Sequence, residues 1–319
     1  MKTYLVTGGA GFIGSSLVSR LLENYKVVVI DNFNDYYDIH IKERNISEFQ
    51  ENNNFKLYKC DIRNKEELEV VFKDNKIDCV IHLAAYAGIR NSINNPNIYT
   101  EVNVIGTQNL LEIMKDYNVR KIVFSSSSSV YGNSEILPLN ENMDTDSPLS
   151  PYAATKKASE VMLYTYHSLY NIDVIILRLF TVYGPRQRPD LAIYKFTKAI
   201  MNNEEITMYK INSSLRDYTY IDDVVDAFIN SIYYIEKSNS IYEIMNIGSN
   251  KPIKLIDMID ILAKNLNKKP NIKIVVNQLG DVDNTHADIH KAKSLINYIP
   301  KTNFDEGIKK FIEWFKKAN

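Results

Sequence analysis

A strand–glycine–helix sequence near the N-terminus constrains the fold of this chain more than any other feature. Residues 4–7 form a short apolar run, and Gly8, Gly11 and Gly14 follow at intervals of three before a segment of helical periodicity. Glycines at these places permit a tight turn, a close approach of backbone to a pyrophosphate, and close packing of helix on strand. The helix N-terminus offers free N–H groups to phosphates. The pattern predicts a dinucleotide-binding βα turn.

The second predicted strand supports this interpretation through the carboxylate that follows it. Residues 26–30 are apolar after Lys26, and Asp31 lies roughly 20 residues beyond Gly11, where an acidic residue usually holds the ribose 2′-hydroxyl of NAD. The same carboxylate repels the 2′-phosphate of NADP. If the glycines stood alone, an ordinary βα turn would explain them. The preceding strand, the following helix and Asp31 together favour a binding site for NAD.

Strand-like and helical segments alternate through the first half of the chain. Such alternation predicts an α/β fold with a doubly wound parallel sheet covered by helices on both faces. The predicted strands are residues 4–7, 26–30, 55–59, 79–83, 121–125 and 174–179, all short and apolar. The predicted helices are residues 12–23, 65–72, 103–117 and 152–169.

The regular alternation of strand-like and helical segments ends after Gly184-Pro185. A helix is expected at residues 193–201, short strands follow, and helices at residues 255–266 and 305–315 close the chain. We therefore expect a smaller α/β domain interleaved with the end of the first. The expected division assigns residues 1–180 plus about 218–247 to a nucleotide-binding domain, and about 181–217 plus 248–319 to a substrate domain.

Composition excludes several classes of protein. The 38 basic and 39 acidic residues leave a net charge of −1, whereas a protein that coats nucleic acid carries a basic excess. No apolar run is long enough to cross a bilayer, and Gly8 comes too early for a secretory signal. Cys60 and Cys79 make no disulfide framework, and the pair His286 and His290 lacks further metal ligands. We expect a cytoplasmic protein without a metal, nucleic-acid partner or membrane partner.

Tyr152 and Lys156 form a YxxxK motif within a predicted helix. Residues i and i+4 share a helix face, so the Lys156 ammonium is expected to lower the pKa of Tyr152 from about 10. A phenol tuned in this way exchanges protons with a sugar hydroxyl near neutral pH. A chance surface pair gives the same motif, because the chain has 22 tyrosines.

Five serines, Ser125–Ser129, follow the predicted strand at residues 121–125. Open α/β sheets bind ligands at the carboxyl ends of their strands, so this run lies where a substrate is expected. A polar turn of low complexity is the alternative. The glycine turn, Asp31, the serines and the YxxxK motif nevertheless occur in one coherent order.

That order resembles the extended short-chain dehydrogenase/reductases, and among them the nucleotide-sugar epimerases, over essentially the whole chain. The resemblance rests on TGGAGFIG (7–14), DNFNDYYD (31–38), HLAA (82–85), SSVYG (128–132), YAATKKASE (152–160), FTVYGPRQRPD (180–190), RDYTYIDD (216–223) and GDVDNTHAD (280–288). The second, sixth and last of these are most similar to UDP-glucuronate 4-epimerases. His286 and Asp283 stand where that group commonly has tyrosine and proline.

The resemblance implies a Rossmann-type domain with bound NAD and C4 epimerisation of a UDP-hexuronic acid, UDP-glucuronate to UDP-galacturonate, through a 4-keto sugar. Tyr152 matches the general base, Lys156 its electrostatic partner, and Ser127 the hydroxyl that binds the sugar 4-OH. The implied cofactor contacts are Gly8, Gly11, Phe12, Ile13, Asp31, Asn32, Asp61, Ile62, Leu83, Ala84, Ala85, Asn103, Tyr152 and Lys156. The implied uridine and pyrophosphate contacts are Lys195, Phe196, Arg216 and Asp281.

We expect Ser128, Ser129 and Thr181 to hydrogen-bond the uronate carboxylate, with Arg188 as a supporting charge. The alternative is that the serines only satisfy backbone groups at the strand end. Related decarboxylases carry glutamate at the position of Ser129, and 4,6-dehydratases carry an Asp-Glu pair at Ser128-Ser129. Without the resemblance, Arg188 and Arg216 would be interpreted as solvated surface residues.

Other functions stay open at this stage. The nearest is a 4-epimerase of UDP-glucose or UDP-N-acetylglucosamine, because pocket shape depends on side chains distant in sequence. A UDP-glucuronate decarboxylase is less favoured. A non-catalytic NAD-sensing protein is also less favoured, because such a protein would not need Ser127, Tyr152 and Lys156. The resemblance also implies a homodimer formed through helices near residues 103–117 and 152–169.

Overall fold

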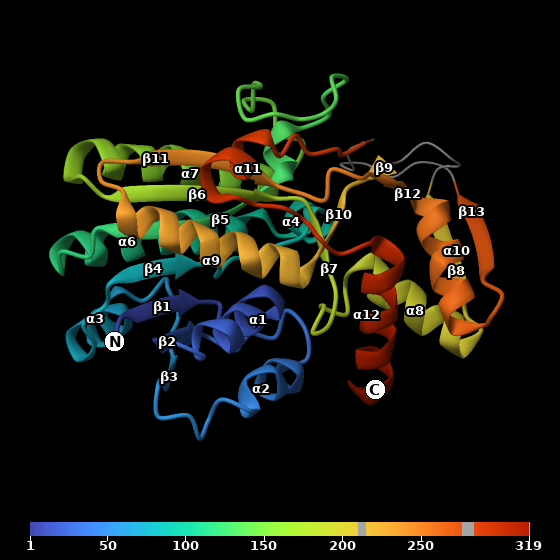
Figure 1. Cartoon of the computed structure of the whole chain (residues 1–319), viewed down its shortest axis with the longest axis horizontal. Coiled ribbons are helices and arrows are strands. Elements are labelled where there is room, and N and C mark those ends of the chain that lie inside the picture. Colours follow the sequence, from blue (N-terminus) through green and yellow to red (C-terminus); the bar gives the residue numbers. More distant parts are fainter. Residues whose placement is uncertain (210–214, 276–283, 319) are drawn as a thin grey trace.

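The computed structural model describes residues 1–209, 215–275 and 284–318. Its centre is a seven-stranded sheet with the order β11-β6-β5-β4-β1-β2-β3, in which every neighbouring pair is parallel (Figure 1). The strands are β1 (Thr3–Thr7), β2 (Lys26–Asp31), β3 (Phe55–Lys59), β4 (Cys79–His82), β5 (Lys121–Ser127), β6 (Asp173–Leu179) and β11 (Tyr242–Ile247). The predicted doubly wound parallel sheet is confirmed.

Helices cover both faces of this sheet, which is why its strands are apolar throughout. The helices α1 (Phe12–Leu21) and α9 (Ile221–Lys237) contact each other on one face; α3 (Lys65–Asp74), α6 (Thr107–Asp116) and α7 (Pro151–Tyr170) contact one another in sequence on the other. Alternate strand residues supply the two cores: Tyr4 and Val6 belong to the first, and Leu5 to the second.

The predicted helix at residues 103–117 begins earlier than expected and starts as a π-helix. The π-helical segment is Thr100–Gly106 and continues directly into α6. The carbonyl of Asn103 accepts hydrogen bonds from the hydroxyls of Thr107 (2.6 Å) and Ser159 (2.8 Å). Single π-helical turns of this kind often occur beside functional sites.

A smaller α/β region lies at one end of the sheet (Figure 1). Its strand pairs are β7 (Thr181–Tyr183) with β10 (Tyr218–Tyr220), β8 (Glu205–Tyr209) with β13 (Asn271–Val275), and β9 (Leu215–Arg216) with β12 (Ile253–Lys254). Its helices are α8 (Ala192–Asn202), α10 (Leu255–Leu266) and α12 (Phe304–Ala318), and α10 packs on the other two. Strand β11, which follows β7–β10 in the chain, pairs with β6 of the large sheet.

Short helices complete the described part of the chain. They are α2 (Ile39–Ser47), α4 (Ile89–Asn94), α5 (Pro96–Tyr99), the 3-10 turn Ser128–Tyr131 and α11 (His290–Ile296). Asp38 begins α2 by accepting a hydrogen bond from the backbone of His40. Among the described residues, no helix combines the length and apolar character that a membrane span requires.

Candidate active site

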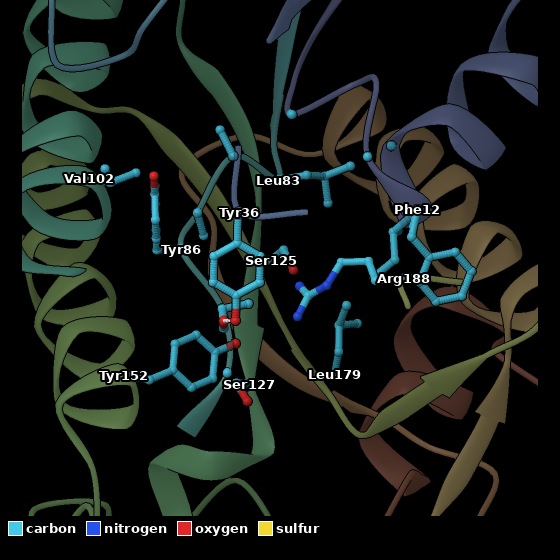
Figure 2. A pocket seen from close by; sticks show the side chains of 18 of the residues that line it. Phe12, Tyr36, Leu83, Tyr86, Val102, Ser125, Ser127, Tyr152, Leu179 and Arg188 are labelled. Carbon is cyan, nitrogen blue, oxygen red and sulfur yellow. Dashed lines mark hydrogen bonds between the residues drawn. The ribbon is translucent and has the colours of Figure 1, made fainter. Parts of the chain in front are cut away.

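A cavity of about 370 Å³ opens at the carboxyl ends of β1, β2, β4, β5 and β6, where ligands bind in open α/β sheets (Figure 2). Two groups of residues line it. The sheet-edge wall comprises Gly8, Gly11, Asp31, Ser125–Ser129, Tyr152 and Lys156. The loop wall comprises Tyr36, Tyr86, Thr181, Arg188 and Leu191.

The glycine turn has the packing that a dinucleotide site requires. Gly8 has a φ of +70°, and a Cβ there would lie 2.8 Å from the backbone nitrogen of Ala84. A Cβ on Gly14 would lie 2.2 Å from the Gly8 carbonyl oxygen, which would push helix α1 away from the turn. Gly11 caps α1 at its N-terminus and lines the cavity. The N–H groups of the helix start therefore face a space open to a pyrophosphate.

Asp31 lies at the next strand end and is nearly fully buried. It accepts hydrogen bonds from the backbone of Phe33 (2.9 Å) and Ala10 (3.2 Å), and the Lys42 ammonium lies 3.7 Å away. Burial lowers the pKa of Lys42, and the Asp31 charge opposes that shift. Lys42 also donates to the side chain of Asn34 (3.1 Å). The carboxylate thus faces the cavity from a fixed position.

Other predicted cofactor contacts extend this wall. Asn32 donates to Asp61 at 2.9 Å, which joins the ends of β2 and β3. Burial opposes ionisation of Asp61, but hydrogen bonds from Arg63 and Asn32 lower its pKa to about 2. Phe12, Ile13, Ile62, Leu83, Ala84 and Ala85 also line the cavity.

Tyr152 and Lys156 project from the first two turns of α7 onto the end of β5. The Lys156 ammonium donates to the Ser125 carbonyl at 2.8 Å and lies 4.8 Å from the centre of the Phe124 ring. Burial lowers the pKa of Lys156 to about 7, and the charge of Glu160 acts in the opposite direction.

The expected lowering of the Tyr152 pKa is wrong for this arrangement. Burial raises the pKa of Tyr152, whereas its hydrogen bond with Ser127 and the charge of Arg188 act to lower it. The reason is the burial of Tyr152 itself, which disfavours the charged phenolate more strongly than Ser127 and Arg188 favour it.

The serine run turns sharply at the end of β5. The Ser127 hydroxyl accepts a hydrogen bond from the Ser129 backbone (3.2 Å) and donates to the Ser129 hydroxyl (3.0 Å). Ser127 therefore satisfies a backbone group at the strand end and also contacts the hydroxyl of Ser129. Ser128, Ser129 and Thr181 also line the cavity, and they follow the neighbouring ends of β5 and β6, where Ser127 pairs with Leu179.

Arg188 is held within the molecule and is not a solvated surface residue. It forms two hydrogen bonds with Asp190 (2.9 and 2.7 Å), and its guanidinium lies 5.2 Å from the centre of the Tyr36 ring. The Tyr36 hydroxyl donates to the Ala87 carbonyl at 2.6 Å. Figure 2 shows Arg188 directed toward Tyr36, with Tyr36 and Tyr152 pointing into the same space.

Several lining residues were not identified individually from the sequence. They include Asn34, Tyr36, Tyr37, Lys42, Tyr86, Val102, Leu179 and Phe180. The motif DNFNDYYD contains three of them, and its similarity to the family was the available signal. Its two tyrosines were assigned no role because nothing in the spacing shows which way an irregular loop directs its side chains.

Five predicted contacts do not line the cavity or cannot be placed. Asn103 lies behind the wall, where its amide donates to the Tyr86 carbonyl (3.0 Å) and its oxygen accepts from the Tyr86 backbone (2.8 Å). Lys195 and Phe196 lie on α8 and Arg216 on β9, outside the cavity lining. Asp281 lies outside the described residues.

His82, His286 and His290 do not form a metal site in the described part of the chain. His82 is buried, and its ring nitrogens contact the hydroxyls of Thr7 (2.6 Å) and Thr107 (3.0 Å), so it is a hydrogen-bonded core residue. His290 begins α11 while His286 precedes it, so the two do not share a helix face. Within residues 1–209, 215–275 and 284–318, no group of three or more potential ligands gathers for a metal.

Comparison with known proteins identifies the class. A sequence profile of the family described as "GDP-mannose 4,6 dehydratase" matches residues 5–311. The chain belongs to this family, within the extended short-chain dehydrogenase/reductases, and the resemblance seen in the sequence is confirmed.

Named relatives are more specific. The chain is 43% identical to a UDP-glucuronate 4-epimerase of Thermodesulfobacterium geofontis, over 99% of this chain and 97% of that one. A crystal structure of UDP-glucuronic acid 4-epimerase from Bacillus cereus with UDP-glucuronic acid and NAD superposes with a TM-score of 0.94. It is 36% identical, over 99% of this chain and 100% of that one. A UDP-glucose 4-epimerase of Thermotoga maritima with UDP-glucose has a TM-score of 0.89 and 33% identity, with 99% of each chain covered.

Proposed function

We propose that this protein is an NAD-dependent UDP-sugar 4-epimerase that interconverts UDP-glucuronate and UDP-galacturonate. The observation that carries the proposal is the convergence of Ser127, Tyr152 and Lys156 with a hydroxyl-rich pocket end, beside a glycine turn and Asp31. The B. cereus relative, crystallised with UDP-glucuronic acid and NAD, supports both the substrate and the cofactor.

The residues divide the work of such a reaction. Tyr152 accepts the proton of the sugar 4-hydroxyl and later returns it, and Ser127 holds that hydroxyl in place. Lys156 in its charged form favours the phenolate of Tyr152. Gly8, Gly11 and Asp31 would hold NAD, which when bound would supply the hydride acceptor and donor for the sugar C4. Because the dinucleotide is held in one place, the 4-keto sugar must turn over in the site for hydride to return to its other face.

The hydroxyl-rich end suits a carboxylate. Ser128, Ser129 and Thr181 are neutral donors that can bind the uronate, with Arg188 as a nearby cation. A fixed carboxylate disfavours loss of CO₂ from the β-keto acid. The family profile carries the name of a dehydratase, but dehydration needs an acid–base pair, and this chain has only hydroxyls at Ser128-Ser129.

Neutral UDP-sugars are the second candidate substrates. The T. maritima relative was crystallised with UDP-glucose, and the shared machinery of Ser127, Tyr152 and Lys156 acts on C4 whatever C5 carries. Arg188 already pairs with Asp190, so the ranking rests on the relatives: identity and TM-score are 36% and 0.94 for the B. cereus UDP-glucuronic acid 4-epimerase, against 33% and 0.89 for the T. maritima protein. We therefore rank the uronate first.

Three further features belong to the proposal. Ile105, Val161, Tyr164 and Leu169 are apolar and exposed on the helical segment before α6 and on α7, which favours a homodimer through these helices. Cys60 and Cys79 are free thiols, as suits a cytoplasmic protein. We also divide the chain into a nucleotide-binding domain (1–180 and about 218–247) and a substrate domain (about 181–217 and 248–319), because β11 pairs with β6.

The test uses purified protein without added reductant. Incubation with UDP-glucuronate should yield UDP-galacturonate, and the reverse reaction should reach the same ratio of sugars. A parallel panel with UDP-glucose and UDP-N-acetylglucosamine ranks the substrates. Absence of a C4 product from every UDP-sugar would overturn the proposal, and conversion of neutral sugars alone would replace the uronate.

A further inference from the structure

The end of β5 and one face of α7 are joined by a ladder of polar contacts. Ser127 hydrogen-bonds Tyr152, the Ser125 carbonyl accepts from Lys156, and the Ser126 hydroxyl donates to Glu160 at 2.6 Å. Tyr152, Lys156 and Glu160 follow one another at intervals of four, so they share one helix face. The first two belong to the proposed catalytic machinery, and the third has no role in it.

Glu160 is a buried carboxylate with a full set of partners. Its side chain is 2% exposed and receives two hydrogen bonds from Arg178 of β6, at 3.0 and 2.8 Å. Arg178 is equally buried, and its guanidinium lies 4.9 Å from the centre of the Tyr131 ring. A buried ion pair contributes little net stability, because desolvation offsets the attraction. This pair therefore calls for a reason other than stability.

We propose that Glu160 is a positioning residue of the epimerase, whose fixed carboxylate, one helical turn beyond Lys156, keeps the Lys156 side chain charged and directed at the Ser125 carbonyl. This inference rests on the proposed function, since it assigns a reason for a charged Lys156. Arg178 and Ser126 hold the carboxylate so that its charge stays at that place.

The surroundings of Lys156 leave Glu160 as its source of negative charge. On α7 it faces Tyr152 and Glu160. On β5 it meets the Ser125 carbonyl and the Phe124 ring, which do not titrate. On β4, burial and the Lys156 charge lower the pKa of His82 to about 3, so that histidine stays neutral. Arg178 on β6 lies behind Glu160 and is compensated by it.

The sign of the effect follows from these charges. Burial lowers the pKa of Lys156 to about 7, and Glu160 is the charge that raises it. Removal of the carboxylate leaves Arg178 as an uncompensated buried cation, which further disfavours a charged Lys156. Lys156 then loses its proton at a lower pH. Above that pH it is uncharged and no longer stabilises the Tyr152 phenolate.

The experiment compares Glu160→Gln with the wild type. The alkaline limb of the pH profile of kcat should move to lower pH by about one to two units, the range for one nearby charge. Glu160→Gln/Arg178→Gln removes both charges and should move the limb less. Glu160→Asp restores the carboxylate and should bring the limb back toward the wild-type pH. Glu112→Gln removes a carboxylate that pairs with Lys115 and Tyr166, and should leave the limb in place.

A measurement without turnover separates this inference from the proposed function. The 13Cε shift of Lys156 in lysine-labelled protein, assigned by its loss in Lys156→Arg, reports the charge of that lysine directly. Titration at a lower pH in Glu160→Gln supports the inference even if no UDP-sugar is converted. Unchanged titration in both Glu160→Gln and the double variant overturns it. If the single variant does not fold, the charge-neutral double variant provides the decisive comparison.

Discussion

The two walls of the cavity are held in place by different forces. In the sheet-edge wall, Gly8, Asp31 and Ser127 lie at the ends of strands whose positions are defined by the six parallel ladders of the seven-stranded sheet. In the loop wall, Tyr36 and Arg188 come from irregular segments and are held by ring stacking and by Asp190. The sheet-edge wall suits groups that must keep one geometry, such as a dinucleotide and a proton carrier. The loop wall suits groups that differ between substrates.

The largest effect is expected in the sheet-edge wall, from Tyr152→Phe. The substitution removes only the proton carrier, and general acid–base groups contribute about 10²–10⁴-fold to the rate. We expect turnover of UDP-glucuronate to fall within that range while bound NAD is retained. Activity assays beside an absorbance measurement of NAD content check both points. Near-normal turnover would contradict the assignment of the base.

The same difference between walls explains what the sequence predicts and what it does not. The strands and the glycine turn were predicted because apolar runs and glycine spacing determine where a strand ends, whereas the catalytic roles of Ser127, Tyr152 and Lys156 were implied by the family resemblance. Tyr36, in a loop, and Lys42, on α2, were missed because the direction of each side chain depends on a tertiary partner, Ala87 or Asp31. The pKa of Tyr152 was mispredicted because an i,i+4 spacing shows proximity but says nothing about the burial of Tyr152 itself.

A second test addresses the place where the walls meet, at Ser129 and Thr181. Ser129→Ala and Thr181→Ala each remove one proposed donor to the uronate carboxylate. Hydrogen bonds to charged groups contribute about 1.5–3 kcal/mol, so epimerisation should slow by roughly 10–100-fold. A looser carboxylate should also raise the share of decarboxylated UDP-pentose, measured by mass spectrometry. Ser47→Ala removes an exposed hydroxyl of α2 that is not part of the cavity lining, and is the control. Unchanged binding and product ratio in both variants would remove these residues from the carboxylate site.

Asp31 tests how strongly the sheet-edge wall selects its cofactor. Asp31→Ala removes the carboxylate that is proposed to bind the ribose hydroxyls, and leaves Lys42 as a nearby cation. NAD affinity should fall about tenfold or more, from the loss of a charge-assisted hydrogen bond. NADP affinity should fall less or rise. Calorimetric titration of cofactor-stripped protein distinguishes the outcomes, and equal losses for both cofactors would argue against a ribose contact.

Arg216 tests the smaller region, where Lys195, Phe196 and Arg216, three of the predicted uridine and pyrophosphate contacts, lie outside the cavity lining. If Arg216 reaches the diphosphate in the substrate complex, Arg216→Ala should raise KM for UDP-glucuronate about tenfold and change NAD affinity little. Arg216→Lys keeps the charge and should recover part of the loss. An unchanged KM would show that Arg216 does not make the diphosphate contact that the family resemblance implies.

The smallest effect is expected where the loop wall is fastened to the nucleotide-binding half. Arg186 pairs with Glu48 at the end of α2, and its guanidinium lies 5.7 Å from the Phe49 ring. Exposed ion pairs and cation–π contacts contribute roughly 0.5–1 kcal/mol each. Arg186→Ala should therefore speed NAD release a few-fold, because the loop that carries Arg188 loses one attachment. Stopped-flow measurement of NAD release provides the test. The control is Arg44→Ala, because Arg44 lies on α2 as well but donates to the Ala318 carbonyl and not to the loop that carries Arg188. If release is unchanged by Arg186→Ala at low and high salt, Arg188 and Tyr36 alone hold the loop wall in place.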